Sequence, residues 1–337
     1  MKRYIAVDSG KYATKVACYI PDSEKIEKFK FRTKISDGNF KDDAVETATM
    51  VVEYEGKTYK IGNGAVKEAE LNTSKTSEIH KICTLTAIAM CVSKDEVDEV
   101  CVSAGIPVKE WENVEKRAEY KAYIFPEGEI SLKIMDSQLN PITKTFKIVS
   151  RHVYPETMGA LYLDNVVENS NDAVAIIDLG NLNVNGTYWN RRELDRQYSF
   201  TDELGGSILI SGLSQELSAE FSRCDENYVA KVLKQPLEHR MLVPNRPNPE
   251  IEKRSKEMIT DYLIDFVNLI KRRCDAKHWS LDFMTLVFIG GTSKILVNEI
   301  KNVFGEETVI PDDPEYANVV GFLRIMCGKV LHKMIQI

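Results

Sequence analysis

The chain has 337 residues, which is enough for two domains of roughly 150 residues each. It carries 44 basic and 51 acidic side chains, a net charge of −7, so charge gives no reason to expect direct contact with nucleic acid or an anionic membrane. No apolar run approaches the roughly 20 residues of a membrane span, and the histidines and cysteines lack the spacing of a zinc site. We therefore expect a cytoplasmic protein with reduced cysteines.

Residues 4–19 predict a β-hairpin whose bend carries the sequence DSG. Lys11 and Lys15 accompany Asp8 at this bend. A turn with available backbone N–H groups beside lysines is able to bind phosphate. An ordinary hairpin with solvated lysines explains the same residues equally well, so the turn alone does not decide the function.

The next part of the chain alternates hairpins and helices. Residues 24–45 are charged and weakly patterned, which predicts an exposed excursion. The glycines of GNGAVK lack the third glycine of a dinucleotide fingerprint. We predict a hairpin over 50–61, a helix through 79–89 capped by Thr76 or Ser77, a strand over 97–104, a helix over 111–123, and a hairpin joining 130–134 to 143–149.

Pro155 and Glu156 predict the start of another helix, because proline suits the first helical position and an acid suits the first turn. Two roles are open for Glu156. It is either a carboxylate that interacts favourably with the helix dipole, or one placed to orient or deprotonate a water molecule.

Residues 173–189 repeat the pattern of the first hairpin. A buried apolar run ends in Asp178-Leu-Gly, a polar turn follows, and a second strand begins at Val184. Two hairpins with an Asp-x-Gly bend predict a pair of turns that grip the phosphates of a nucleotide, and the functional interpretation depends on this pair.

The remaining chain adds two further glycine pairs at predicted helix starts, where backbone can approach a phosphate or sugar closely. A tight loop without a ligand is the alternative explanation for Gly205-Gly206. It has no Walker motif, no GxSxG and no kinase-type HRD/DFG pair. We predict a helix opened by Gly205-Gly206, a helix over 226–233 capped by Asp225, a long amphipathic helix through 251–270, a strand over 283–289, Gly290-Gly291-Thr292 opening a helix over 294–304, and a last helix over 316–334.

The order DSGKYATK, PE helix, DLGN, GG helix, GGT and a last helix with ANVVG resembles the actin, heat-shock-chaperone and sugar-kinase superfamily over essentially the whole chain. The segments MVVEYEGKTYKIGNGA and SAGIPV are similar to bacterial actin-like proteins, especially the ParM type that segregates plasmids. The resemblance implies an α/β fold of two domains, with mixed five-stranded sheets and helices, around a nucleotide cleft. Domain I would comprise 1–154 and 312–337 with an insert at about 24–74, and domain II 155–311 with an insert at about 198–278.

The resemblance also assigns the site, with ATP (GTP as the alternative) and Mg²⁺ as cofactors. Asp8 and Asp178 would face each other across Mg²⁺ and contact it through its waters. Glu156 would orient the attacking water. Glu156 and the start of the last helix would act as two hinges. The nucleotide contacts would come from the turn residues Ser9, Gly10, Lys11, Tyr12 and Lys15, from Gly180, Asn181 and Asn183, from Gly205 and Gly206 near the ribose, and from Gly290, Gly291, Thr292 and Lys294 near the base and α-phosphate.

The second turn departs from the family pattern DxGxxTxD. Asn181, Asn183 and Asn185 stand where glycine or serine, threonine and aspartate are commoner. Asn183 can still form a hydrogen bond. The second acid of the motif is missing, so the resemblance does not fix the rate at which the chain would hydrolyse ATP.

By this resemblance, the chain is expected to be a filament-forming ATPase that segregates plasmid DNA. ATP would drive polymerisation, and hydrolysis would destabilise the filament. Its partners would be other copies of itself and an adaptor protein bound to centromere-like plasmid DNA, with no direct contact to nucleic acid or membrane. A small-molecule kinase of the same superfamily and a cytoskeletal actin homologue without a segregation role remain alternatives.

Overall fold

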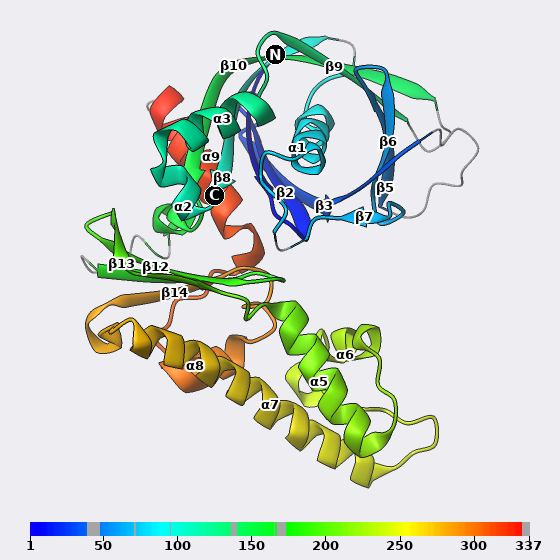
Figure 1. Ribbon diagram of the computed structural model, residues 1–337, viewed down its shortest axis with the longest axis vertical. Helices are drawn as coiled ribbons and strands as arrows, with labels where there is room; N and C mark the ends of the chain where they lie inside the picture. Colours follow the sequence, from blue (N-terminus) through cyan, green and yellow to red (C-terminus); the bar gives the residue numbers. More distant parts are fainter. Residues whose placement is uncertain are drawn as a thin grey trace. The chain divides into compact units, whose positions relative to one another are not determined.

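The computed structural model describes residues 1–38, 48–70, 72–94, 96–135, 140–164, 166 and 173–331. The chain divides into two compact units, Met1–Leu163 with Tyr316–Ile337, and Asp164–Glu315. The sequence predicted that the chain passes from the first unit to the second between residues 154 and 155 and returns between 311 and 312. Each unit is an α/β structure, and Figure 1 labels the elements of both.

The first unit contains a large mixed sheet and its helices. Its elements are β1 Lys2–Ser9, β2 Ala13–Ile20, β3 Lys25–Arg32, β4 Lys34–Asp37, β5 Thr49–Tyr54, β6 Lys57–Gly62, β7 Lys67–Glu68, α1 Glu78–Met90, β8 Val97–Ile106, α2 Val108–Glu112, α3 Val114–Ile124, β9 Glu129–Met135, β10 Pro141–Pro155, a 3₁₀ turn η1 Met158–Tyr162 and α9 Ala317–Leu331.

Ten strands of the described residues form this sheet, in the order β3-β2-β1-β8-β10-β9-β5-β6-β4-β7. The predicted sheet of five strands corresponds to β3, β2, β1, β8 and β10. It is larger because β10 is 15 residues long and pairs first with β9 and then with β8. The excursion predicted over residues 24–45 is wrong where the structure describes it, because β3 and β4 are strands of this sheet. The predicted exposure is confirmed for β3, in which only Phe31 is buried, and residues 39–45 lie outside the described part.

Alternation along β1 and β2 places apolar side chains on both faces of the sheet. Ile5 and Val7 belong to the core around α1, which lies in the curve of the sheet (Figure 1). Tyr4 is also buried, and its neighbour across the strand pair is Tyr19. Helix α9 contacts β1, β2 and β8. Burial on both faces holds the bend between β1 and β2 at a fixed place in the unit.

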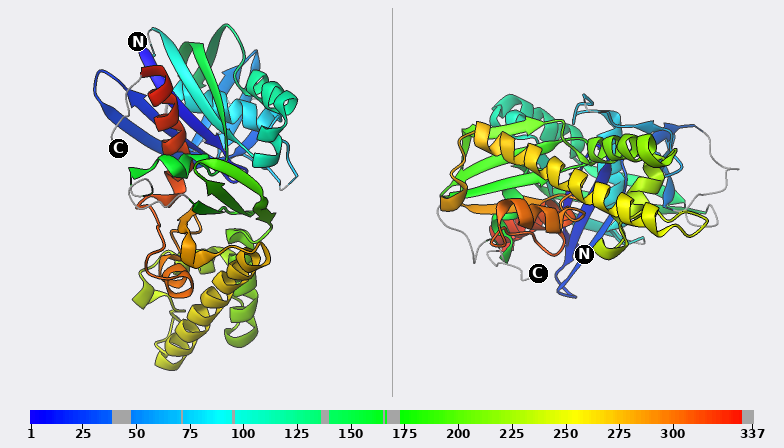
Figure 2. Two further views of the ribbon diagram at one scale, coloured as in Figure 1. Left: turned by 90° about the vertical axis from the view of Figure 1, so that its left-hand side faces the viewer. Right: turned by 90° about the horizontal axis from the view of Figure 1, so that it is seen from below.

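The second unit has a smaller sheet with helices on one face. Figures 1 and 2 show α5 and α7 side by side on that face, and α6 and α8 share their apolar core. Its elements are β11 Ala173–Leu179, β12 Val184–Asn190, β13 Glu193–Asp202, α5 Gly206–Phe221, α6 Glu226–Leu233, η2 Leu237–His239, α7 Pro249–Ala276, η3 Leu281–Phe283, β14 Thr285–Ile289, α8 Val297–Phe304 and the 3₁₀ turn η4 Pro314–Tyr316 at its end.

The strand order of this sheet is β13-β12-β11-β14 among the described residues. A fifth position beside β14 is occupied by a single parallel bridge between Val287 and Val309. Backbone bonds from Phe288 N to Val309 O (2.9 Å) and from Val309 N to Leu286 O (2.9 Å) hold it. The predicted five-stranded sheet is therefore reduced to four strands and one bridge.

Two predicted helix starts are wrong. Pro155 is the last residue of β10, because β10 pairs with β8 as far as Ile106, and a 3₁₀ turn begins only at Met158. After Gly290 the chain forms turns, and α8 begins at Val297. The predicted end of the last helix at Met334 lies outside the described residues. No helix in the described ranges has the length and apolar character needed to cross a membrane.

Candidate functional site

The two Asp-x-Gly bends have the same closing hydrogen bond. Gly10 N donates to Ala13 O at 3.1 Å in the first bend, and Gly180 N donates to Asn183 O at 3.0 Å in the second. A Cβ atom at Gly10 would lie 2.9 Å from the Ala13 carbonyl oxygen, and one at Gly180 would lie 3.0 Å from that of Asn183. A side chain would therefore crowd the closing carbonyl in both bends, which favours glycine at the two positions for the same reason. The backbone N–H groups of Gly10 and Gly180 form the hydrogen bonds that close the bends.

In the first bend, Asp8 lies opposite Lys15 in the strand register. Their charged groups are 3.6 Å apart, and Asp8 is nearly buried. Lys75 Nζ donates to Ser9 O at 2.8 Å and lies 3.2 Å from Glu156 Oε1. The structure thus brings the predicted residues Asp8, Lys15 and Glu156 together in one unit with Lys75.

Sequence reasoning missed Lys75, which is only 4% exposed although it is a lysine. Burial alone would lower its pKa, but the carboxylates of Glu156 and Asp8 outweigh burial and raise the pKa of Lys75. The side chain is therefore a fixed positive charge. No local motif in the sequence marks it, because its partners lie far away in the chain.

Glu156 follows β10 directly, and its backbone N–H donates to Ile106 O at 2.8 Å. Its position is fixed by the β8–β10 pairing and by Lys75, not by a helix start. The helix-dipole explanation of Glu156 therefore does not apply. The interpretation as a positioned carboxylate remains.

Buried hydroxyl groups lie behind the first bend. Ser9 Oγ is 3.1 Å from His80 Nδ1 and 3.3 Å from Thr14 Oγ1. Thr14 Oγ1 is 3.0 Å from Thr33 Oγ1, which donates to Gly10 O at 2.7 Å. Burial, together with the charges of Lys75 and Lys11, lowers the pKa of His80 to about 3, so the imidazole is neutral. This neutral network supports the bend from within the unit.

Lys11 and Tyr12 occupy the tip of the first bend. Burial and the nearby charge of Lys75 lower the pKa of Lys11, while Glu156 and Glu110 act in the opposite direction. The Tyr12 ring is 43% exposed and lies 3.7 Å from the guanidinium of Arg32. Lys11, Lys15 and Lys75 thus interact with the carboxylates of Asp8, Glu156 and Glu110, so the bend holds three ammonium groups and three carboxylates close together.

In the second bend, Asp178 lies opposite Asn185, the position that Lys15 has in the first. Asn185 Oδ1 accepts a hydrogen bond from Thr201 Oγ1 at 2.9 Å. The second bend thus lacks the lysine of the first. The two bends share their backbone but not their charges.

The three glycine sites predicted in the second unit converge. Gly206 N donates to Gly180 O at 3.0 Å, and Thr292 Oγ1 donates to the same carbonyl at 2.9 Å. A Cβ atom at Gly205 would lie 2.4 Å from Asn181 O. One at Gly290, which has φ +93°, would lie 2.5 Å from Asp178 Oδ1. Backbone from β11, α5 and β14 is therefore closely packed around the second bend.

Two predicted residues lie at the margin of this cluster. Lys294 Nζ is 3.6 Å from Asp313 Oδ1, and both side chains are well exposed. A Cβ atom at Gly291 would meet Glu315 only at an ordinary 3.6 Å. Gly291 therefore has no packing reason to be glycine, unlike Gly205, Gly206 and Gly290.

Comparison with known proteins gives the fold. Residues 6–159 match the family model described as "Actin like proteins N terminal domain". A filament structure of Alp12 is 23% identical, with TM-score 0.73 over 97% of this chain and 99% of that one. The chain has the actin-like fold.

Other actin-like structures align over nearly their whole length. The archaeal actin homologue Ta0583 is 15% identical, with TM-score 0.76 over 97% of this chain and 100% of that one. Bacillus thuringiensis ParM with ATP is 14% identical, with TM-score 0.72 over 98% and 99%. No curated protein sequence matches the chain. The resemblance of this actin-like chain to the ParM type, and its two α/β units, are confirmed.

Proposed function

We propose that the chain is a nucleotide-dependent ATPase that forms filaments and segregates plasmid DNA from within the cytoplasm. The observation that carries the proposal is the cluster in the first unit. Lys75 joins Glu156 to the Ser9 carbonyl, beside the Asp8–Lys15 pair. A partly buried carboxylate, Glu156, beside lysines at a glycine bend suits a phosphate and an attacking water together.

In the first unit, Lys11 and Lys15 would neutralise phosphate charge. The bend from Ser9 to Tyr12 would contact phosphate through groups other than the Gly10 amide, which bonds to Ala13. Glu156 would accept a hydrogen bond from the attacking water and orient it toward phosphorus. The ammonium of Lys75 would keep Glu156 ionised and in place.

In the second unit, Asp178 and the bend residues Asn181 and Asn183 would contact phosphate, with amide groups in place of the commoner hydroxyl and acid. Gly205 and Gly206 would lie near the ribose. Gly290, Gly291, Thr292 and Lys294 would lie near the base and the α-phosphate. The close packing of Gly180, Gly206 and Thr292 supports a fixed backbone surface for such contacts.

Asp8 and Asp178 would help to hold Mg²⁺. The part of the chain that the structure describes has no group of three or more histidine, cysteine or acidic residues able to hold a metal alone. This fits Mg²⁺, which is commonly bound by one or two carboxylates together with phosphates and water. When bound, the ion supplies charge neutralisation at the phosphates.

The filament proposal is supported by the likeness to structures solved as filaments, including that of Alp12. The nucleotide proposal is supported by the likeness to a ParM solved with ATP. An adaptor protein bound to centromere-like plasmid DNA would connect the filament to its cargo. The acidic net charge of −7 agrees with an indirect connection to DNA.

Right-angle light scattering and phosphate release test the proposal together. The purified chain is mixed with Mg²⁺ and ATP, GTP, ADP or no nucleotide. Scattering should rise only with a triphosphate and should decay as phosphate appears. Glu156→Ala should slow phosphate release by roughly 100-fold or more and prolong the scattering. Glu119→Ala, at an exposed position on α3, is the matched control.

Other outcomes would contradict parts of the proposal. Phosphate release with flat scattering at all protein concentrations would exclude the filament and favour a small-molecule kinase. No response to any nucleotide would exclude the nucleotide site. Segregation is tested by measuring how often a low-copy plasmid is lost per generation in cells with and without the active chain. Equal loss in both would favour a cytoskeletal role.

A further inference from the structure

The second half of β10 is a free sheet edge within the described residues. Pairing of β10 with β9 ends at Lys147 opposite Glu129, whereas pairing with β8 continues to Pro155 opposite Ile106. From Ile148 onward, β10 therefore has a strand on one side only. A free edge presents backbone N–H and C=O groups that can pair with another extended chain.

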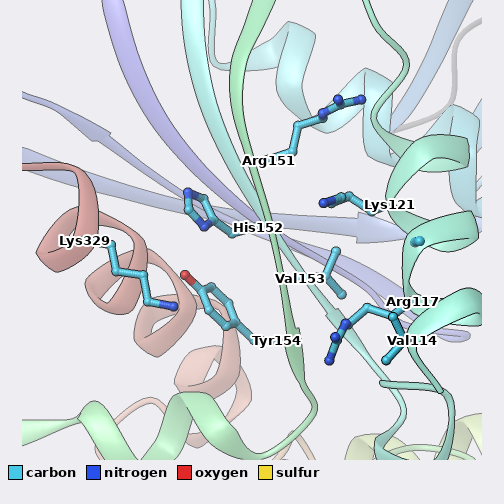
Figure 3. A pocket seen from close by; sticks show the side chains of 9 residues that line it. Val114, Arg117, Lys121, Arg151, His152, Val153, Tyr154 and Lys329 are labelled. Atoms are coloured by element: carbon cyan, nitrogen blue, oxygen red, sulfur yellow. The ribbon is translucent and has the colours of Figure 1, made fainter. Parts of the chain in front are cut away.

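A pocket of about 300 Å³ lies along this edge. Figure 3 shows Arg151 and Val153 pointing to the side of α3, and His152 and Tyr154 pointing to the side of Lys329 on α9. The pocket is thus a groove that follows β10 between two helices. Its lining residues are Val114, Arg117, Ala118, Lys121, Arg151, His152, Val153, Tyr154 and Lys329.

The groove is basic although the chain as a whole is acidic. Four of its nine lining residues are lysine or arginine, and none is an acid. Among the described residues, Arg151 is the lining cation with a close carboxylate, Glu127 at 2.6 Å. Burial and the charges of Lys329 and Lys121 lower the pKa of His152, so the imidazole adds no charge near neutral pH. The groove therefore favours a ligand with negative charge.

Tyr154 supplies a second indication of a ligand. The residue is only 4% exposed, and its hydroxyl has no hydrogen-bond partner among the residues described. Burial raises its pKa, so the hydroxyl keeps its proton and can donate. A buried donor without a partner is costly unless a ligand or water accepts its hydrogen bond.

We propose that this groove binds an acidic peptide segment of a partner protein in extended conformation. The peptide would add a strand to the free edge of β10, and its carboxylates would pair with Lys121 and Lys329. The four residues from Arg151 to Tyr154 span about 13 Å of strand, so several peptide residues fit along the edge. A small anion would use the lysines but not the edge. This proposal is independent of the nucleotide proposal.

Fluorescence polarisation on the full chain without nucleotide tests this. The probe is a dye-labelled peptide of about eight residues that alternates glutamate and valine. A second peptide has the same sequence with alternate backbone nitrogens methylated, which removes its strand hydrogen bonds. A third replaces glutamate with lysine, and pyrophosphate serves as a small competing anion.

The acidic peptide should bind, and N-methylation should weaken binding by about fivefold or more, as should Lys121→Gln combined with Lys329→Gln. Lys94→Gln with Lys116→Gln removes the same charge outside the groove and should have little effect. Equal binding of the methylated peptide, or full displacement by pyrophosphate, would replace the proposal with a small-anion site. No binding, or equal binding of the lysine peptide, would overturn it.

Discussion

Lys75 Nζ lies 3.2 Å from Glu156 Oε1 and 2.8 Å from the carbonyl oxygen of Ser9. One buried ammonium therefore connects the end of β10 to the bend after β1. Under the proposed function, this connection sets where the Glu156 carboxylate stands relative to a phosphate at the bend.

Lys75→Met keeps the length of the side chain and removes its charge. We expect phosphate release per molecule to fall by about tenfold or more, because Glu156 loses the group that holds it. The affinity for ADP should fall less, since Lys11 and Lys15 remain. Lys75→Arg should retain part of the activity. Equal loss of ADP affinity and phosphate release would instead make Lys75 a phosphate ligand.

The same substitution should lower stability. Removing one partner of a buried ion pair costs several kcal/mol, but Glu156 keeps 17% exposure, so we expect about 1–3 kcal/mol in urea unfolding. Lys116→Met on the surface of α3 is the control and should change stability little. An unchanged midpoint for Lys75→Met would mean that Glu156 finds another partner.

His80 should make the chain less stable in mild acid. Its pKa is lowered from 6.5 to about 3 in the folded state, so only the unfolded chain binds its proton between these values. His80 therefore does not reduce the free energy of unfolding above pH 6.5. Below that pH the free energy of unfolding falls by up to about 1.4 kcal/mol per pH unit. His80→Gln, measured by urea unfolding between pH 5 and about 7.5, should show a shallower fall. Parallel curves for the two proteins would contradict this role.

Gly321→Ala should destabilise the first unit. A Cβ atom at Gly321 would lie 1.9 Å from the carbonyl oxygen of Gly159, and this contact is between backbone segments that cannot move aside. Thr157 N also donates to Asn318 Oδ1 at 3.0 Å at this crossing. We expect a loss of roughly 2–3 kcal/mol. Gly291→Ala meets only an ordinary contact and should cost far less, so similar losses would contradict the packing argument.

The sequence predicted features that are decided locally. Both Asp-x-Gly bends, the helix opened by Gly206, and the cap of α6 by Asp225, whose side chain accepts from Tyr228 N, are confirmed. In each case a few neighbouring residues and their backbone requirements determine the structure.

Features decided by distant contacts were not predicted. Lys75 and Ser9 are 66 positions apart, and nothing near Lys75 in the sequence marks it as buried. Pro155 suits a helix start, yet parallel pairing with Ile106 keeps it in β10. The strands of residues 25–37 are rich in charged residues, and their hydrophobic pattern does not predict that they pair in a sheet.

Protonation of the Asp98 carboxylate should weaken the first unit. It is fully buried, and its oxygen accepts from Arg3 Nε at 2.8 Å and from Ser93 N at 2.7 Å. Burial alone would raise its pKa, but Ser93 N, the N-terminal ammonium 3.0 Å from Asp98 Oδ1, and Arg3 together outweigh burial and lower it. The stabilisation is therefore present above the unfolded pKa of about 3.9 and is lost as the pH falls through the folded value.

Asp98→Asn keeps the shape of the side chain and removes its charge. Arg3 loses its carboxylate partner, and the new NH₂ group faces the N–H donors of Arg3 and Ser93. We expect a loss of about 3–5 kcal/mol at neutral pH. Because the native carboxyl itself becomes protonated in acid, the difference from the unmodified chain should shrink below about pH 4. Urea unfolding at several pH values measures it. A difference that stays constant down to low pH would mean that packing, and not charge, is the role of Asp98.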